Sequence, residues 1–438
     1  MGTEPPDESG RPPDPGRPAG FVSRRTVVVV ITIAALLVTT GLVVLAQRGD
    51  RSWEPGQLVI LSGRDDSAGA QRKELIEEWN ALHPSNQARI EEVRSIADAE
   101  RSEMLARAAG DGDDVDILNL DVAYLPEFAE ADLLRPLSED EVDRDAFLPG
   151  PLSTCEYGGT LWALPFNTDA ALLYRHLAFA PDAPSSWADM EAKITQHLEP
   201  NREKAAGPKA GFVTQLSNYE ALTVNALEAV WAAGGEIVDD DGEVRVDSRA
   251  AAEGLRNLVD GLVNEHIDGE SPSYTEDAST AAFRGERALF LRNWPLAYRS
   301  LIGSAGDRPA PFDIRVSRLP WPSVLGGQNL AIAERSEHPR AARALIDFLT
   351  NARSQEILFE RGGFAATRKA VYADSKVPYA DVLLDAVQRA QLRPRSPHYA
   401  LFSEVLREAV HTMLVTHDRE QPPELAHDLR AALRGQRT

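Results

Sequence analysis

Polar side chains interrupt the ends of several short apolar runs in this sequence, and they are the residues best suited to chemistry. In open α/β sheets ligands bind beyond the carboxyl ends of the strands, so residues that directly follow a strand are the first candidates for a site. Carboxylate and amide oxygens accept hydrogen bonds from hydroxyl groups, and aromatic faces pack against C–H surfaces, a combination that suits a neutral sugar. The candidates are Arg64, Asp65, Asp121, Tyr124, Asn167, Asp169, Gly327 and Gln328.

Structural roles compete with binding at several of these positions. Asp65 or its neighbour Asp66 would cap the helix that follows them. Tyr124 would be a core residue, and Asp169 would fix a hinge. Trp294, in the segment RNWPLAY, precedes a proline suited to the first position of a helix. A tryptophan at such a place is either part of the core or a stacking surface for a ligand.

The sequence carries no signature of catalysis. It lacks the G-x-S-x-G, H-E-x-x-H, phosphate-loop and G-x-G-x-x-G motifs, and its 9 histidines include no pair at metal-ligand spacing. The single cysteine, Cys155, excludes an intramolecular disulfide and a metal cluster made of cysteines alone. We therefore expect no catalytic residue, no metal and no cofactor. A glycosidase carboxylate pair is defined by its separation in space, so an exported glycoside hydrolase stays an alternative.

Composition and charge set wider limits. The 438 residues allow two or three domains, and 43% hydrophobic with 26% charged residues is typical of a globular body. Asp and Glu number 68 against 46 Lys and Arg, which gives a formal net charge of -22. Such a surface repels phosphate backbones, so we expect no nucleic-acid partner.

The elements that must position the candidates alternate between short apolar runs and longer amphipathic ones. This alternation is typical of βαβ units with a largely parallel sheet. A proline at position 84 ends the first predicted helix. The pattern predicts strands over 58–61, 89–93 and 116–120, and helices over 70–82, 97–109 and 124–129.

Two extended apolar stretches, 161–174 and 319–332, interrupt this simple scheme. Each is a candidate strand that crosses between domains. The segment between them is mostly helical and contains predicted helices over 219–233 and 250–264, and a helix over 339–349 follows the second stretch. Two crossings predict two discontinuous α/β lobes.

The composition of the N-terminal region predicts a tail followed by a membrane segment. Residues 1–25 are rich in Pro, Gly and charge, which predicts a disordered cytoplasmic tail. Residues 26–46 carry no charge and would span about 30 Å as a helix, one bilayer core. Arg24 and Arg25 precede this run, so the positive-inside rule places the body outside the cytoplasm. The alternative is an export signal, of which Arg24 and Arg25 resemble the twin-arginine kind, that is cleaved after Ala46 and releases a secreted protein.

Seven segments in order resemble the extracytoplasmic solute-binding proteins of ATP-binding-cassette (ABC) sugar importers, in particular the trehalose/maltose-binding branch. The resemblance covers about 58–411. Its segments are DILNLDVAYLPEFAEADLLRPL (116–137), LWALPFNTDAALLYR (161–175), SSWADM (185–190), NYEALTVNALEAVWAAGGE (218–236), FRGERALFLRNWPLAY (283–298), GGQNLAI (326–332) and RPRSPHYALFSEVL (393–406).

The resemblance implies a two-lobe, periplasmic-binding-protein-like fold of type II, whose discontinuous lobes are joined by crossing strands and preceded here by one transmembrane helix. Lobe I would comprise 50–167 and 326–365, and lobe II 168–325 and 366–438. A sugar would lie in the cleft between them. The sugar contacts implied by position are Asp121, Asp169, Tyr219, Glu220, Trp294, Gly327 and Arg393. Gln328 stands where that branch commonly has tryptophan, which leaves the sugar open, and no lipidated cysteine is present.

We therefore expect a monomeric sugar-binding receptor that delivers an α-linked glucose disaccharide, such as trehalose or maltose, to the membrane subunits of an ABC permease. It would be no enzyme and would work by closure of its lobes. Three alternatives stay open besides a hydrolase or a cleaved signal. They are a receptor for a cationic solute, a receptor for a peptide, and a membrane-anchored sensor that reports sugar to a signalling partner.

Overall fold

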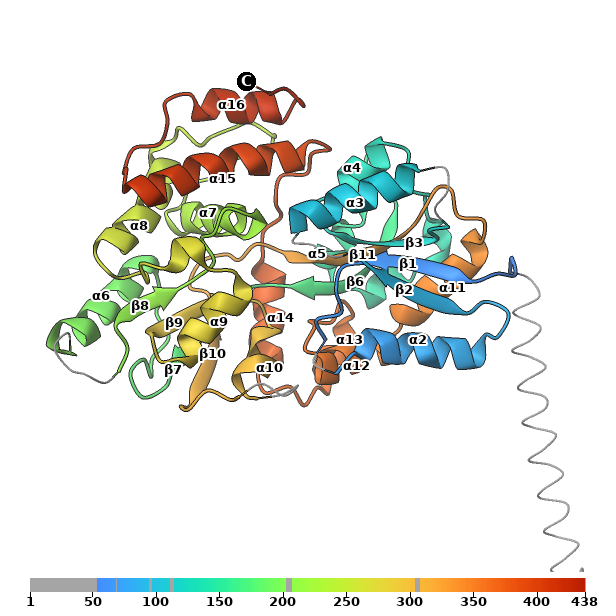
Figure 1. The fold of residues 1–438 in the computed structure, drawn as a ribbon, viewed down its shortest axis with the longest axis horizontal. Coiled ribbons are helices and arrows are strands. Elements are labelled where there is room, and N and C mark those ends of the chain that lie inside the picture. Colours follow the sequence, from blue (N-terminus) through green and yellow to red (C-terminus); the bar gives the residue numbers. More distant parts are fainter. Residues whose placement is uncertain are drawn as a thin grey trace, which may run out of the picture. The chain divides into compact units, whose positions relative to one another are not determined.

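Two β-sheets organise the part of the chain that the structure, a computed structural model, describes (Figure 1). The described residues are 53–67, 69–93, 97–110, 114–201, 207–303 and 308–437. The tail and membrane segment expected over 1–46 lie outside them. Within the described ranges, no helix combines the length and the apolar character that a membrane crossing requires.

The first sheet has the strand order β2-β1-β3-β11-β6. Strand β1 is parallel to β2 and β3, as the βαβ pattern predicts, but β11 is antiparallel to both β3 and β6. The prediction of a largely parallel sheet is therefore wrong at β11, because this strand enters from the other sheet and not through a βαβ crossover. The strands are β1 (Leu58–Ser62), β2 (Ala88–Glu92), β3 (Ile117–Asp121), β6 (Ala163–Asp169) and β11 (Gly326–Ile332).

The second sheet has the order β10-β7-β9-β8 and is also mixed. Strand β8 is parallel to β9, whereas β7 is antiparallel to its neighbours β9 and β10. A two-stranded hairpin, β4-β5, stands apart from both sheets. These strands are β4 (Glu156–Tyr157), β5 (Thr160–Leu161), β7 (Leu172–His176), β8 (Ala210–Val213), β9 (Ala288–Asn293) and β10 (Ile314–Arg318).

Helices flank both sheets. In Figure 1, α3 and α4 lie on one side of the first sheet and α2 on the other, and α15 packs across α7 and α8. The helices are α2 (Gln71–Leu82), α3 (Ala97–Ala109), α4 (Leu125–Glu130), α5 (Pro149–Ser153), α6 (Trp187–Leu198), α7 (Glu220–Ala232), α8 (Arg249–Val263), α9 (Glu276–Arg284), α10 (Ala297–Leu301), α11 (Pro339–Leu349), α12 (Ala352–Ile357), α13 (Lys369–Ala373), α14 (Ala380–Arg389), α15 (Tyr399–Thr416) and α16 (Leu425–Ala432). Short 3-10 turns occur at Glu139–Glu141, Arg144–Ala146, Glu199–Asn201 and Ser271–Ser273, with a π-helical turn at Leu358–Gly362.

The two stretches predicted as crossings do connect the sheets. Strand β6 ends at Asp169 in the first sheet, and β7 begins at Leu172 in the second. The chain returns between β10 and β11, and a further passage leads from Ala365, which pairs with Thr168, to α14, which packs on β10. The fold is thus a two-lobe α/β architecture. The lobe bounds given above stay a prediction.

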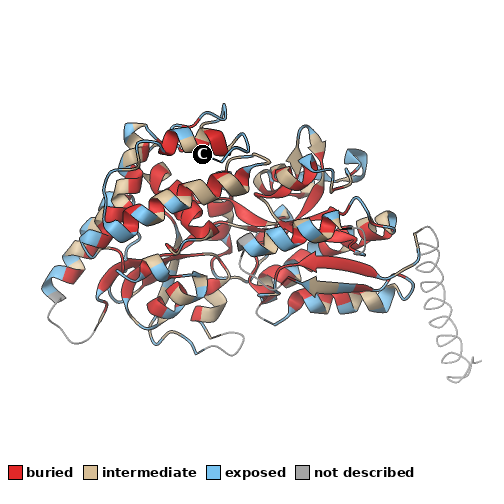
Figure 2. Cartoon of the chain, turned by 45° about the horizontal axis from the view of Figure 1, so that its top comes forward, coloured by how far each residue is buried: buried red, intermediate tan, exposed pale blue. Residues whose placement is uncertain are grey.

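Buried apolar residues form two clusters, one of which includes strand residues of both sheets, and Figure 2 shows buried residues gathered in these strands. All five residues of β1 and all six of β9 are buried. Helix α7 is buried along most of its length because α8 and α15 enclose it. Cys155 is fully buried, as expected of a small apolar side chain.

Candidate functional site

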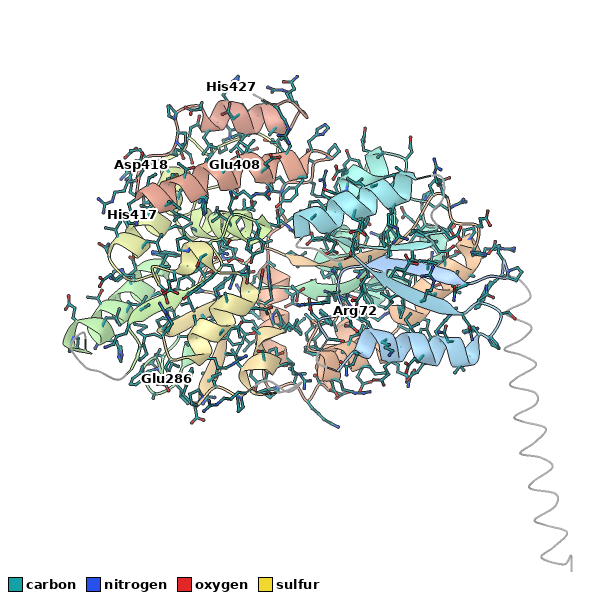
Figure 3. The ribbon with its side chains drawn as sticks, viewed as in Figure 1. Arg72, Glu286, Glu408, His417, Asp418 and His427 are labelled. Atoms are coloured by element: carbon teal, nitrogen blue, oxygen red, sulfur yellow. The ribbon has the colours of Figure 1, made fainter. Side chains whose placement is uncertain are left out.

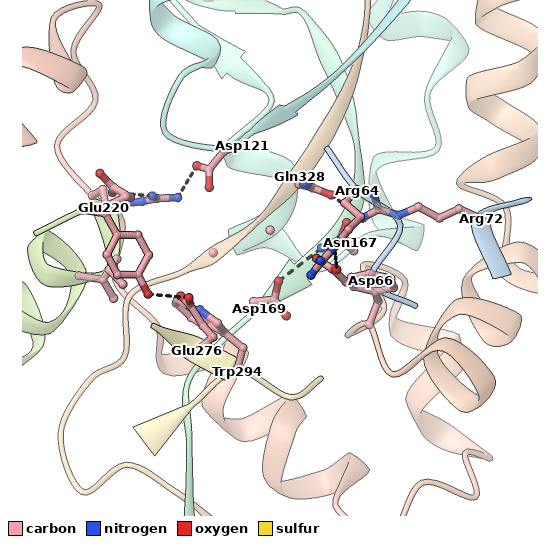
Figure 4. Close-up of a pocket in the computed structure, with 17 residues that line it drawn as sticks. Arg64, Asp66, Arg72, Asp121, Asn167, Asp169, Glu220, Glu276, Trp294 and Gln328 are labelled. Atoms are coloured by element: carbon pink, nitrogen blue, oxygen red, sulfur yellow. Dashed lines mark hydrogen bonds and ion pairs between the residues drawn. The ribbon is translucent and has the colours of Figure 1, made fainter. Parts of the chain in front are cut away.

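A cavity of about 200 Å³ lies where the ends of strands from both sheets meet (Figure 4). From the side of the first sheet it is lined by the loop after β1, by the ends of β3 and β6, and by the start of β11. From the side of the second sheet it is lined by the start of α7, by α9 and by the residue after β9. Its lining residues are Arg64, Asp66, Arg72, Asp121, Asn167, Asp169, Tyr219, Glu220, Ala221, Val224, Glu276, Trp294, Gly326, Gly327, Gln328, Phe364 and Arg393.

Arg393 joins the two sides of this cavity. Its Nη2 donates to Asp121 Oδ1 at 2.5 Å, and Asp121 ends β3 in the first sheet. Its Nη1 donates to Glu220 Oε1 at 2.9 Å, and Glu220 begins α7. Figure 4 shows both carboxylates joined to the guanidinium by dashed lines. Because the guanidinium is buried and paired on both sides, it acts as an ionic link between the lobes.

Glu220 is held by more than its arginine. Ser403 Oγ donates to Glu220 Oε2 at 2.6 Å, and the Tyr399 hydroxyl donates to Oε1. Burial raises the pKa of Glu220, whereas Arg393 and these two hydroxyls lower it. The C-terminal helix α15 therefore supplies the support for the cavity wall at α7.

Arg72 reaches from α2 to the end of β1 (Figure 3). Its Nη1 donates to Ser62 Oγ at 3.3 Å and its Nη2 to Gln328 Oε1 at 2.6 Å, while the guanidinium lies 4.7 Å from the centre of the Phe364 ring. Asn119 Nδ2 donates to the same Gln328 oxygen at 3.1 Å. The amide of Gln328 is thus oriented by two donors.

Asp169 has an environment that favours its protonated form. Burial raises the pKa of Asp169 to about 7, the charge of Asp121 adds to this, and Arg72 opposes it. Its neighbour Asn167 donates from Nδ2 at 3.4 Å, a long contact. Asn167 Oδ1 is buried and has no hydrogen-bond partner among the described residues. These two side chains leave hydrogen-bonding capacity that a ligand in the cavity would satisfy.

Two aromatic side chains, Trp294 and Tyr219, also line the cavity. The Trp294 ring packs over the guanidinium of Arg292, whose Cζ is 4.1 Å from the ring centre. The Tyr219 hydroxyl donates to Glu276 Oε2 at 2.5 Å, and burial together with the charge of Glu276 raises the pKa of Tyr219. An indole and a phenol here provide flat apolar surface next to hydrogen-bonding groups.

The approach of β11 to β6 depends on a glycine. Gly327 has φ +121°, and a Cβ atom added there would lie 2.3 Å from the carbonyl oxygen of Asn167. Only glycine fits both the backbone conformation and the space. At Gly326 an added Cβ would be 3.5 Å from the Trp294 ring, so the indole lies directly against this strand.

Two of the predicted site residues lie outside the cavity wall. Tyr124 is buried, with its ring centre 6.0 Å from that of Tyr399. Asp65 Oδ1 accepts from the backbone N of Ser67 at 3.0 Å and from its Oγ at 2.6 Å. Ser67 Oγ in turn accepts from the backbone N of Gln71 at the start of α2. Asp65 thus supports the helix start through Ser67 and does not cap it directly.

The other ten predicted residues line the cavity. Several further lining residues were not predicted from the sequence. Arg72 had a detectable signal, because it shares a helical face with Leu75 and Trp79, where an apolar residue is expected. Glu276 had none, since its approach to Tyr219 depends on α9 packing beside α7. The lining residues not predicted are Asp66, Arg72, Ala221, Val224, Glu276, Gly326 and Phe364. Among the described residues, no cluster of His, Cys, Asp and Glu is arranged to hold a metal ion.

Two lobes joined by crossing segments, with a polar and aromatic cavity at their junction, define a solute-binding protein. Residues 74–385 match the family model of the bacterial extracellular solute-binding proteins. The chain belongs to this family, whose members bind solutes and are not enzymes.

Individual relatives agree with this assignment. A probable ABC transporter-binding protein of Deinococcus radiodurans is 28% identical over 382 residues, which are 81% of this chain and 89% of that protein. The maltose-bound structure of MalE3 from T. maritima superposes with a TM-score of 0.76 at 27% identity, covering 86% of this chain and 99% of that one. The GacH receptor of Streptomyces glaucescens has the same fold, with a TM-score of 0.73 at 21% identity over 88% of this chain and 100% of that one.

Proposed function

We propose that this protein is the extracytoplasmic sugar receptor of an ABC importer and that it binds an α-linked glucose disaccharide, with maltose and trehalose as the first candidates. The observation that carries the proposal is the cavity lining, which brings Trp294 and Tyr219 together with the carboxyl group of Asp169 and the amide of Asn167. A stacking ring beside hydrogen-bonding groups suits a pyranose, which has an apolar C–H face and hydroxyl groups around its edge. The likeness to a maltose-bound structure at 27% identity supports the same ligand class.

Binding would proceed by closure of the lobes. Asp121 and Asp169 belong to the first sheet, whereas Glu220 and Trp294 belong to elements of the second. A sugar that contacts both sets stabilises the closed arrangement over any open one, because only closure makes both sets of contacts available. The permease subunits would then distinguish the closed receptor from the open one. The receptor acts as a monomer in this scheme.

A second candidate ligand is a sugar or other solute that carries a positive charge. Five carboxylates line the cavity against three guanidinium groups. Arg393 pairs with Asp121 and Glu220, and Arg64 pairs with Asp66 at 2.6 Å, so Arg72 is the lining arginine whose charge acts on Asp169. An ammonium group near Asp169 would complete the charge balance of the site.

Thermal shift with a panel of maltose, trehalose, lactose, glucosamine and spermidine tests both candidates. A ligand at 100 times its dissociation constant stabilises the folded protein by about 2.7 kcal/mol. We expect maltose or trehalose to raise the melting temperature and lactose, a β-linked control, to leave it unchanged. A shift with spermidine or glucosamine alone would favour the cationic ligand. No shift with any α-glucoside would overturn the proposal.

For the segment 26–46 we propose a membrane anchor that keeps the body at the outer face of the membrane. The support is its uncharged sequence over 21 residues and the preceding pair Arg24 and Arg25. Fractionation should find the full-length chain with the membrane. Mass spectrometry that finds a mature N-terminus at Gln47 in a soluble fraction would establish a cleaved signal instead.

A further inference from the structure

Behind the cavity wall lies a fully buried ion pair that does not touch the cavity. Arg292 of β9 donates from Nε to Glu228 Oε2 at 3.0 Å and from Nη2 to Glu228 Oε1 at 2.8 Å, a two-pronged contact. The exposed fractions of the two side chains are 1% and 3%. A buried pair of this kind costs desolvation, and apolar residues of similar volume often serve stability equally well. Its presence therefore calls for a role other than stability.

Glu228 fixes the returning crossing segment to α7. Its Oε1 accepts from the backbone N of Val324 at 3.1 Å and from Ser323 Oγ at 3.0 Å. Ser323 Oγ also accepts from the backbone N of Ala171 at 2.7 Å, and Ala171 lies between β6 and β7 in the other crossing. One carboxylate thus connects both segments about which the lobes would move.

Arg292 fixes the stacking surface. Its guanidinium lies under the Trp294 ring at 4.1 Å, and its Nη1 donates to Gln215 Oε1 at 3.1 Å. The plane of an arginine is suited to support an indole from one side while pairing with a carboxylate along its edge. The ring of Trp294 lines the cavity, so its position depends on a group that is itself held by Glu228.

We propose that Glu228 and Arg292 are positioning residues that couple the Trp294 stacking surface to the two crossing segments, so that ligand contact and lobe movement change together. The chain of contacts runs from Ala171 through Ser323, Glu228 and Arg292 to Trp294 without a gap. This inference rests on the proposed function, because it takes the cavity as the ligand site. It predicts that changes to residues outside the cavity alter binding.

The test compares Glu228→Gln, Arg292→Lys and the double variant Glu228→Gln/Arg292→Met with Asp116→Asn. Asp116 is a matched control, because it is a buried carboxylate that accepts from the backbone N of Val59 at 2.9 Å and from Ser336 Oγ at 2.6 Å, away from both crossings. Three quantities are measured on each variant: the melting temperature, the dissociation constant for maltose, and hydrogen exchange without ligand in peptides that contain Ala171, Val324 and Trp294.

We expect Glu228→Gln to speed exchange in all three peptides and Arg292→Lys to speed it around Trp294, with maltose affinity reduced about tenfold in each. The double variant carries no unpaired buried charge, so it should regain much of the melting temperature without regaining affinity. Asp116→Asn should lower the melting temperature alone.

Two outcomes would overturn the coupling. The first is a double variant in which affinity recovers together with stability, which would show a purely structural pair. The second is unchanged exchange around Trp294 in Glu228→Gln. The exchange measurement needs no ligand, so it decides the inference even if maltose does not bind the unmodified protein and the proposed function fails.

Discussion

Single residues decide what this cavity can hold. Trp294 and Tyr219 offer flat surface, Asp169 offers a carboxyl group, and Asn167 offers an Oδ1 that has no hydrogen-bond partner among the described residues. Gln328 replaces an expected aromatic by an amide that Arg72 and Asn119 orient. The cavity therefore combines a stacking surface with polar groups, which favours a ligand that has both hydroxyls and a C–H face.

Truncation of the stacking ring tests its role in binding. We expect Trp294→Ala to weaken sugar binding by about 30-fold to 1000-fold, the range for aromatic residues at binding hot spots. Trp231→Ala is the matched control, because Trp231 is also partly buried and packs on the core but does not line the cavity. Calorimetric titration and melting of both variants separate the effects. Affinity loss that only follows unfolding, or equal loss in both variants, would remove Trp294 from the site.

The raised pKa of Asp169 makes stability depend on pH in a defined direction. The folded-state pKa is about 7 against an ordinary value of 3.8, so the folded protein holds this proton more tightly than the unfolded chain. The contribution of Asp169 to the free energy of unfolding therefore falls as pH rises from about 4 to about 7.

The variant Asp169→Asn should remove this loss. Urea unfolding should therefore find that the stability of the variant relative to the unmodified protein is higher at pH 8 than at pH 5. Burial also raises the pKa of Glu100 to about 7, so this group contributes to the pH dependence in the same direction. The variant Glu100→Gln is therefore measured as well, to separate the two contributions. An identical pH profile for Asp169→Asn and the unmodified protein would contradict this assignment.

Strands and helices bring these side chains together from distant parts of the sequence. The end of β3 meets β11 with Asp121 opposite Gln328, and β6 meets β11 with Asp169 opposite Gly326. The register of β11 therefore brings the side chains of Asp121, Gln328 and Asp169 close together at the ends of their strands. Its close approach to β6 requires Gly327, which has no side chain to hold the strands apart.

The strand junction is tested by substitution of this glycine. Gly327→Ala should lower the melting temperature strongly, because a positive φ costs about 1–2 kcal/mol for other residues and the added Cβ would also meet a backbone oxygen at 2.3 Å. Gly242→Ala is the control, since Gly242 has φ +81° and no atom within 4 Å of an added Cβ. The difference between the two variants measures the steric part. Equal losses would show that β6 and β11 can separate without cost.

The sequence predicted these elements to different extents. Helices α3 and α11 were predicted with their observed bounds, and the other predicted helices and the first three predicted strands agree within one or two residues, because apolar spacing reports local structure directly. The two predicted crossing strands agree less well, since 161–174 is divided among β5, β6 and β7 and 319–332 becomes a strand only from Gly326. The antiparallel entry of β11 was missed, since pairing direction depends on which lobe a strand comes from. Buried polar contacts such as Arg72 with Gln328, 256 residues apart, have no local pattern and appear only in three dimensions.

The whole molecule consists of two lobes that share a cavity and are joined by the crossing segments. Arg393 pairs with carboxylates from both sides, so any opening that separates Asp121 from Glu220 must break one of these contacts. A buried charge that loses one partner is unfavourable, and a ligand that supplies further contacts across the gap shifts the population toward closure. The crossing segments and the Glu228–Arg292 pair are the parts that would transmit this movement.

Closure of the lobes around a sugar is tested by small-angle scattering with and without maltose or trehalose. The sample is residues 53–438, which form one compact unit. The account predicts that a sugar that raises the melting temperature also reduces the radius of gyration, and that Trp294→Ala abolishes both effects at the same sugar concentration. If a sugar stabilised the protein while the radius of gyration stayed constant, closure of the lobes around the ligand would be contradicted.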